Sequence, residues 1–193
     1  MIMIKHLQNS LLMVAAFTLI CGVAFPLLVT GIAAVIAPSQ RNGSMVIVNG
    51  REVGSALVGQ AWTSDKYFHG RPSAIGNQPL PSGGTNRTVA SAAFRKDVAV
   101  LRDSLAKQNE VEGAAIPSDL VMASASGIDP HISTEAAQVQ VTRVMKARGL
   151  VSSRRAHVEQ LISAATDQPL VGIFGMARVN VLRLNIAMDA LRQ

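Results

Sequence analysis

One short segment brings together the residue types of a serine hydrolase. Ser124, Ser126, Asp129 and His131 follow one another closely. In a catalytic triad a histidine accepts the proton of the serine hydroxyl while a carboxylate orients the imidazole ring, and only the folded geometry decides whether this occurs. The segment lacks the G-x-S-x-G turn of many hydrolases, and small residues followed by Asp-Pro are more typical of a turn. We therefore predict no catalytic residue and keep a hydrolase using Ser124 or Ser126 with His131 as the alternative.

The remaining titratable residues do not suggest a metal centre. His6, His69, His131 and His157 are far apart, and none has a cysteine, a second histidine or a carboxylate at the spacing of metal ligands. The sequence therefore predicts no metal site. The single cysteine, Cys21, excludes a disulfide within the chain.

A glycine-containing segment, Ser82–Asn86, is the nearest feature to a phosphate-binding loop. Neither G-x-x-x-x-G-K-[ST] nor G-x-G-x-x-G occurs in the chain. The segment is similar in shape to the Ser-Gly-Gly-x-Gln signature of ABC transporters, and backbone N–H groups before a helix attract anions. A glycine turn that caps a helix beginning at Thr88 explains it equally well. The candidate nucleotide contacts are Ser82, Gly83, Gly84 and Asn86.

A second candidate surface combines aromatic, cationic and turn residues in Tyr67–Pro72. Tyrosine and arginine are enriched at the centres of protein interfaces, so the segment is a candidate for partner docking. The alternative is a loop that its aromatic side chains pin to the domain. The docking candidates are Tyr67, Phe68, His69 and Arg71.

These residues need a scaffold of short strands and helices. Asn49-Gly50 between two apolar runs predicts a hairpin over residues 45–53, and residues 55–60 continue a sheet or form a short helix. Apolar spacing predicts a helix over residues 88–108, and residues 120–123 suggest a short strand. Three more helices are expected. The first is capped by Ser133 and ends at Gly149, the second is capped by Ser152 or Ser153, and the third is capped by Asn180.

An almost wholly apolar run, Leu11–Ala37, precedes this domain. It is long enough to cross a bilayer and about twice the length of a signal-peptide core, so it predicts an uncleaved transmembrane helix. Pro26 lacks a backbone donor and should kink this helix. Gly22 and Gly31 would let another helix approach closely and are further docking candidates.

The predicted organisation is a short cytoplasmic N-terminus (residues 1–10), a transmembrane helix (11–37) and an extracytoplasmic domain (38–193). The fold class is α+β, with a small sheet and about four helices in the domain. The amino terminus and Lys5 before the span slightly favour an N-terminus that faces the cytoplasm. The net charge of +6 favours membrane lipid or an acidic partner, whereas one Trp and one Tyr make a nucleic-acid partner improbable.

Five segments in order resemble the C subunit of the Kdp-type high-affinity potassium-transporting ATPase. Together with the N-terminal span they cover the chain as far as the last helix: Gly54–Gln60, Tyr67–Ala74, Ser82–Asn86, Ala123–Asp129 and Gln168–Leu170, with Pro26 in the middle of the span. Each segment is short, but their common order makes the match specific.

The resemblance implies a non-catalytic subunit of an ATP-driven potassium importer in the bacterial inner membrane. Its implied partners are a channel-like potassium-selective subunit, a P-type ATPase subunit and a small single-span subunit. It also implies a catalytic chaperone that raises the ATP affinity of the ATPase subunit, with Ser82–Asn86 as the nucleotide contact. ATP is cytoplasmic, however, whereas the domain is expected in the periplasm, so we expect any effect on ATP affinity to be indirect.

Overall fold

The computed structural model describes residues 2–169 and 171–191. The chain divides into two compact units between Val53 and Gly54, and each is described by itself. Leu170, the last residue of one segment behind the resemblance, and the terminal residues of the predicted domains, Met1, Arg192 and Gln193, lie outside the described residues.

The first unit is dominated by one apolar helix. It contains α1 (Ile2–Leu19), the π-helical η1 (Ile20–Ala24), α2 (Phe25–Ile36), α3 (Pro38–Arg41), β1 (Met45–Val48) and β2 (Arg51–Ser55), whose last two residues belong to the second unit. Residues Ile2–Ile36 form a single helix that is long and apolar enough to cross a membrane, with a mean hydropathy of 2.5 over its most apolar window. None of that window is buried inside the protein, as expected for a helix that lipid or another helix covers.

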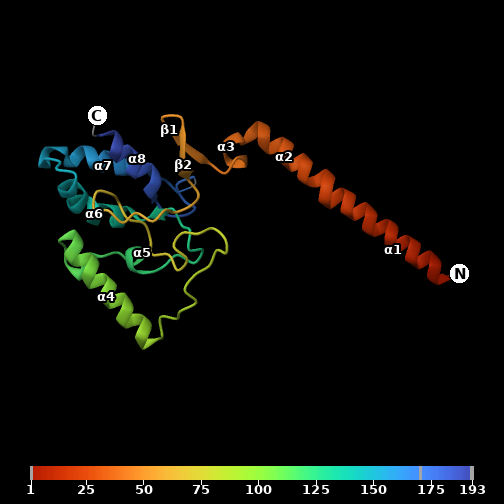
Figure 1. Ribbon diagram of the computed structural model, residues 1–193, viewed down its shortest axis with the longest axis horizontal. Helices are drawn as coiled ribbons and strands as arrows, with labels where there is room; N and C mark the ends of the chain where they lie inside the picture. Colours follow the sequence, from red (N-terminus) through yellow and green to blue (C-terminus); the bar gives the residue numbers. More distant parts are fainter. Residues whose placement is uncertain (1, 170, 192–193) are drawn as a thin grey trace. The chain divides into compact units, whose positions relative to one another are not determined.

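The helix is irregular where the sequence predicted an effect of Pro26. The N–H of Phe25 donates to Ile20 O, five residues earlier, which is the π-helical pattern. Pro26 follows at the start of α2, where its missing N–H is tolerated. The strain expected at the proline is thus absorbed by the wider turn of η1, and Figure 1 shows the helix continuing through it.

The hairpin prediction is confirmed. β1 and β2 pair in a two-stranded sheet, and the two linking residues, Asn49 and Gly50, have φ angles of 51° and 75°. Two positive φ angles are the requirement of a tight primed turn. Residues 56–60 instead form a turn and an irregular stretch, so the predicted continuation of the strand ends at Ser55.

The second unit packs helices around a small sheet. Its elements are α4 (Ala92–Asn109), the 3-10 helix η2 (Gly113–Ala115), α5 (Ser118–Val121), β3 (His131–Ile132), α6 (Thr134–Ala147), the 3-10 helix η3 (Ser152–Arg154), α7 (Arg155–Ala164), β4 (Thr166–Asp167), β5 (Arg178–Asn180) and α8 (Val181–Ala190). The strands form an antiparallel sheet in the order β3-β5-β4. With the apolar N-terminal helix and the hairpin, this confirms the α+β class.

The core of this unit lies around α6. Its buried face meets α7, α4 and β5, and α8 packs on α7. The fully buried apolar side chains include Phe68, from the long connection before α4, and residues of α6, α7, β5 and α8: Val141, Val144, Val158, Val179, Leu184 and Met188.

Two of the predicted helix N-caps are confirmed, and the other predicted helix starts differ in the structure. Ser133 and Asn180 accept hydrogen bonds from Ala136 N and Arg183 N, so both predicted caps are confirmed. The helix predicted from Thr88 begins at Ala92, because Ser91 accepts from Phe94 N. Neither Ser152 nor Ser153 caps α7, since both lie in the 3-10 turn before it.

The strand predicted at residues 120–123 is wrong. Leu120 and Val121 end a short helix, α5, that starts after Pro117 and carries Asp119 in its first turn. A four-residue apolar run has too few positions for helix and strand periods to be told apart. The proline and the acidic residue, both typical of a helix start, were the discriminating signal.

Candidate functional site

Four of the segments behind the resemblance meet at the loop of residues 124–130. Backbone hydrogen bonds join this loop to three earlier stretches of chain: Ser124 N to Pro72 O (3.2 Å), Gly83 N to Ser126 O (3.0 Å) and Gly59 N to Ile128 O (2.8 Å). Ser73 Oγ also donates to Gly127 O at 2.6 Å. Four motifs that are distant in sequence therefore form one continuous patch, which we call the motif patch.

Glycines make this close packing possible. Gly127 has a φ of +72°, and a Cβ atom there would lie 2.5 Å from Gly83 O. At Gly59 a Cβ atom would lie 2.6 Å from Asp129 O. The backbones approach so closely that only glycine fits, which indicates a rigid patch rather than a mobile loop cluster.

The Ser82–Asn86 segment is part of the motif patch and not the start of a helix. The predicted role as a helix-capping turn is wrong, because α4 begins later, at its own cap Ser91. Gly83 N–H, which a phosphate loop would offer to an anion, already donates to Ser126 O. Ser82 and Asn86 are exposed, and Gly84 lies against Ala125. This arrangement supplies one fewer backbone donor than the nucleotide hypothesis assumed.

The first docking candidates, Tyr67–His69, are held by two buried amide side chains, those of Asn185 and Gln140. Phe68 N donates to Asn185 Oδ1 at 2.8 Å, and Asn185 Nδ2 returns a hydrogen bond to Phe68 O at 3.0 Å. Gln140 makes the same exchange with His69, at 2.8 and 3.1 Å. Phe68 is 0% exposed, so its side chain serves the core, which narrows the docking candidates of this segment to Tyr67, His69 and Arg71.

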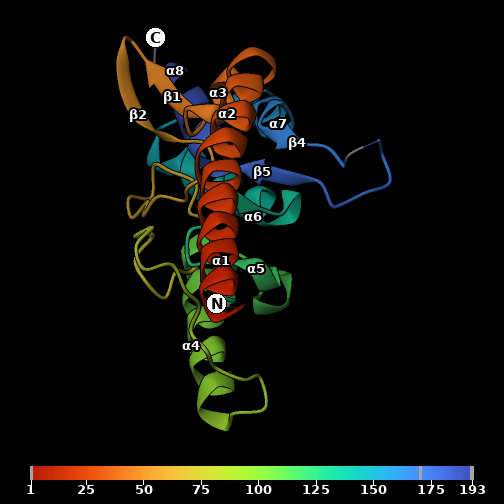
Figure 2. The ribbon, with the colours of Figure 1, turned by 90° about the vertical axis from the view of Figure 1, so that its right-hand side faces the viewer.

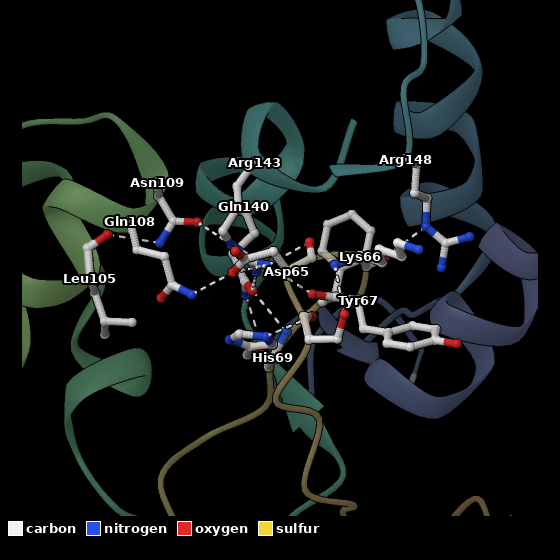
Figure 3. A network of polar contacts seen from close by, with 12 residues as sticks. Asp65, Lys66, Tyr67, His69, Leu105, Gln108, Asn109, Gln140, Arg143 and Arg148 are labelled. Atoms are coloured by element: carbon white, nitrogen blue, oxygen red, sulfur yellow. Dashed lines mark hydrogen bonds and ion pairs between the residues drawn. The ribbon is translucent and has the colours of Figure 1, made fainter. Parts of the chain in front are cut away.

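A buried arginine completes this network, as Figure 3 shows. The Arg143 guanidinium donates to Asn109 Oδ1, Gln140 Oε1 and the carbonyl oxygens of Asp65 and Tyr67, at 2.6 to 3.1 Å. Burial lowers the pKa of Arg143, and nearby Asp65 opposes this shift. Burial, followed by the charge of Arg143, also lowers the pKa of His69. His69 is thus held neutral near pH 7, with Nε2 3.1 Å from Ser64 O.

The Tyr67 side chain contacts aromatic and charged side chains at the surface of the domain. Its ring lies 4.6 Å from the Trp62 ring, and the Arg148 guanidinium sits 5.2 Å from its centroid. Its hydroxyl is 3.4 Å from Asp189, which also pairs with Arg148 at 2.9 Å. The Tyr67 ring therefore packs against other side chains of the domain, although part of the Tyr67 side chain remains exposed.

Arg71 lies where the motif patch meets an open pocket of about 600 Å³. Its guanidinium is 3.1 Å from Asp129 Oδ2 and 3.4 Å from the carbonyl oxygens of Met122 and Ala123. Its buried Nε has no hydrogen-bond partner among the described residues. Arg71 is therefore both a fixed part of the patch and, at 28% side-chain exposure, available to a partner.

A charged row continues from Arg71 across the sheet. His131 lies between two carboxylates, with Nδ1 3.4 Å from Asp129 and Nε2 3.5 Å from Asp167. Burial raises the pKa of Asp129, but hydrogen bonds from His131 and the charge of Arg71 outweigh it, so that pKa is lowered. Asp129 therefore stays ionised and holds the patch and the sheet together.

The hydrolase alternative finds no support in this geometry. Ser126 Oγ accepts from Ile128 N within its own turn, and Ser124 is buried. Among the described residues, neither hydroxyl contacts His131, whose ring nitrogens both face carboxylates. A triad needs the serine and histidine within hydrogen-bond reach. The described residues also contain no group of three His, Cys, Asp or Glu side chains placed to bind a metal ion.

The glycines of the span are open to a neighbour. A Cβ atom at Gly31 would meet nothing within 4 Å, and one at Gly22 would meet only Thr18 at 3.9 Å. Gly31 also lies in a shallow apolar groove lined by Leu27, Leu28, Ile32, Val35 and Ile36. Both positions fit a helix contact, which stays a prediction.

Sequence reasoning missed the buried network and the residues that build it. Arg143 and Gln140 lie three positions apart on the buried side of α6, and Asn185 lies among the apolar positions of α8. Polar residues at core positions of an otherwise apolar stripe were the signal that could have revealed them.

Comparison with known proteins matches almost the whole chain to one family. The family described as the K⁺-transporting ATPase, c chain (KdpC), matches residues 7–190. A potassium-transporting ATPase KdpC subunit of Geobacter sulfurreducens is 45% identical over 97% of this chain and 98% of its own length. Those of Geobacter metallireducens and Gemmatimonas aurantiaca are 46% and 45% identical, over 97% and 98% of this chain and 98% and 94% of their own lengths.

Proposed function

The chain belongs to the KdpC family of potassium-transporting ATPase subunits, and from this premise we propose that it is a non-catalytic subunit that stabilises the assembled importer. It is membrane-associated through its apolar N-terminal helix. The proposed partners are the P-type ATPase subunit, the channel-like potassium-selective subunit and the small single-span subunit. The domain is proposed to lie in the periplasm, beside the outer entrance of the channel-like subunit.

The motif patch carries this proposal. Four hydrogen bonds join its segments, which suits a rigid surface that is complementary to a partner rather than a site that performs chemistry. Arg71 adds a partly exposed guanidinium with a buried, unpartnered Nε at the edge of the patch. Arginine in such a position is a frequent centre of binding energy.

Any influence on ATP affinity is proposed to act at a distance. A periplasmic domain cannot touch cytoplasmic ATP, so the chaperone effect would require that docking favours an ATPase conformation with higher affinity. The occupied N–H of Gly83 is in line with this indirect route.

Two measurements test the proposal, one on the purified complex and one on the isolated chain. Replacing Arg71 by Gln should lower the yield of polytopic subunits that co-purify with the chain, whereas R102Q, on exposed α4, should not. Unfolding of each isolated variant, followed by the single tryptophan Trp62, separates lost docking from lost folding. An unchanged yield with R71Q would remove Arg71 from the docking surface.

The nucleotide hypothesis needs a variant that removes its contacts without strain. Ser82→Ala and Asn86→Gly remove the two side-chain contacts, and Gly83→Ala adds a methyl group that would hinder a phosphate at the backbone. These changes fit the fold, because a Cβ atom at Gly83 meets nothing within 4 Å and glycine keeps the φ of 52° at Asn86. We expect the ATP affinity of the complex to stay unchanged. A clear loss of affinity with intact assembly would establish direct contact.

A further inference from the structure

The connection between β4 and β5 exposes a group of large apolar side chains. Val171, Ile173, Phe174 and Met176 are 80, 77, 69 and 83% exposed. Figure 2 shows this connection reaching away from the sheet of the second unit. Water-exposed surfaces rarely concentrate apolar residues in this way unless something covers them. We call residues 171–176 the apolar loop.

The charge around the apolar loop is arranged in two zones. No charged side chain occurs from Gln168 to Ala177. At the base, Arg178 and Arg183 are 60 and 53% exposed in their side chains and share a single carboxylate, Asp167, at 3.9 and 3.6 Å. Two guanidinium groups against one carboxylate leave an excess of positive charge beside an uncharged tip.

Three acidic residues line the neighbouring pocket. Glu135 is exposed and accepts from Thr134 Oγ1 at 3.1 Å, whereas the other two contact groups of the domain. Asp119 accepts hydrogen bonds from Ser133 N and Oγ, at 2.6 and 3.2 Å. Asp129 is paired with Arg71 and His131. Of these carboxylates, Asp129 is paired with cations, while Arg178 and Arg183 are exposed and pair with Asp167 rather than with the pocket.

A membrane-inserted N-terminal helix would tether the second unit, and with it the apolar loop, to the bilayer. The membrane helix ends at Ile36 and the second unit begins at Gly54. Even a fully extended connection of that length spans at most about 65 Å, at roughly 3.6 Å per residue. The tether keeps the domain at a high effective concentration near the lipid surface, whichever way the units are oriented.

We propose that the apolar loop inserts Ile173 and Phe174 into the lipid surface, with Arg178 and Arg183 against anionic headgroups. An uncharged apolar tip beside exposed cations is the combination that binds membrane interfaces. The inference depends on the membrane helix alone, so it stands or falls independently of the proposed docking role.

Depth-dependent quenching in the full chain tests this. Cys21→Ser removes the only cysteine, and Ile173→Cys then carries an environment-sensitive fluorophore. Val100→Cys on α4, with 62% exposure, is the matched control. In phosphatidylcholine vesicles with phosphatidylglycerol, brominated lipids should quench the label at position 173 and leave that at position 100 bright. R178Q with R183Q should reduce quenching only when phosphatidylglycerol is present.

The assembled complex supplies the opposing test. A photo-reactive group at position 173 should attach to lipid. Attachment to another subunit would overturn the proposal and identify the apolar loop as a protein contact. Equal quenching at positions 173 and 100, or none at either with native Trp62 emission, would overturn it as well.

Discussion

Two buried amides and one buried arginine do most to fix the site at the level of single residues. Gln140 and Asn185 pair with successive backbone units of an irregular segment, in the way that a neighbouring strand would. Arg143 then holds the carbonyl oxygens that precede this segment. Buried polar groups are costly when unpaired, so the segment and the helices constrain one another.

Removing one of these amides should therefore destabilise the domain strongly. Gln140→Leu leaves His69 N–H and C=O unpaired and removes an acceptor from Arg143, so we expect a loss of about 2–5 kcal/mol in the free energy of unfolding. Gln138→Leu, on the exposed side of the same helix, should change it by less than about 0.5 kcal/mol. Urea unfolding of the detergent-solubilised chain, followed by Trp62 fluorescence, measures both. Similar losses in the two variants would contradict the assigned role of Gln140.

The lowered pKa of His69 makes stability depend on pH. The unfolded chain binds a proton near the ordinary histidine pKa of about 6.5, whereas the folded protein does so only at lower pH. This contribution is therefore fully present above pH 6.5 and is lost as the pH falls from there toward the folded pKa. We expect a loss of up to about 1.4 kcal/mol per pH unit in this window.

His69→Gln isolates this effect from the other titrating groups. Glutamine keeps a donor that can face Ser64 O but cannot titrate. The difference in unfolding free energy between pH 7.5 and 5.5 should be smaller in the variant than in the parent chain. An identical pH dependence in both would show that His69 titrates alike in the folded and unfolded states.

At the scale of elements, the motif patch depends on backbone contact between loops. Gly127 and Gly83 both lie where loop 124–130 meets the glycine segment, yet they differ in the space around them. At Gly127 a Cβ atom would meet Gly83 O at 2.5 Å and Ile75 Cγ1 at 2.6 Å, whereas at Gly83 nothing lies within 4 Å. Packing therefore requires a glycine at position 127 but not at position 83.

This difference gives a prediction with an internal control. Gly127→Ala should lower the free energy of unfolding by about 2–4 kcal/mol, because left-handed backbone strain adds to the overlap with Gly83 O. Gly83→Ala should change it by less than about 0.5 kcal/mol. If assembly depends on the patch, only G127A should lower the yield of complex. Equal stability of the two variants would contradict the packing seen at Gly127.

The elements that the sequence predicts well are those with a local chemical signal. Asn49-Gly50 requires a tight turn, and Ser133 and Asn180 offer oxygen atoms to the first turn of a helix, so short-range chemistry was sufficient. The sheet β3-β5-β4 has strands of two or three residues, which are too short for an alternating pattern to be detected. Its pairing depends on tertiary packing alone.

The candidate site was predictable to a smaller extent. The sequence singled out Tyr67–Pro72 and Ser82–Asn86, and the structure brings both to loop 124–130. It could not show that Phe68 points inward or that Gly83 N–H is occupied, because Asn185 and Ser126 are far away in sequence. Long-range partners of this kind leave no local trace in the chain.

At the scale of the whole molecule, the orientation of the apolar helix in the membrane determines whether the domain is on the same side as ATP. The first turn of the helix has no acidic residue, and Lys5 lies within the helix, before the apolar run Leu11–Ala37. Arg41 and Arg51 follow it, with Glu52 beside the latter. The short N-terminal flank therefore carries two positive charges, including the amino group, and by the positive-inside rule this slightly favours the proposed orientation with the flank in the cytoplasm.

Protease accessibility tests this orientation directly. In spheroplasts, a protease added outside should cut exposed connections of the second unit, such as residues 80–90, and leave an N-terminal tag intact. In inverted membrane vesicles the tag should be cut and the domain protected. The physical reason is that the span Ile2–Ile36 separates the tag from the second unit, so a membrane that it crosses leaves the two on opposite sides. The reverse pattern would place Ser82–Asn86 on the side of ATP, and the indirect route to the ATPase subunit would then lose its basis.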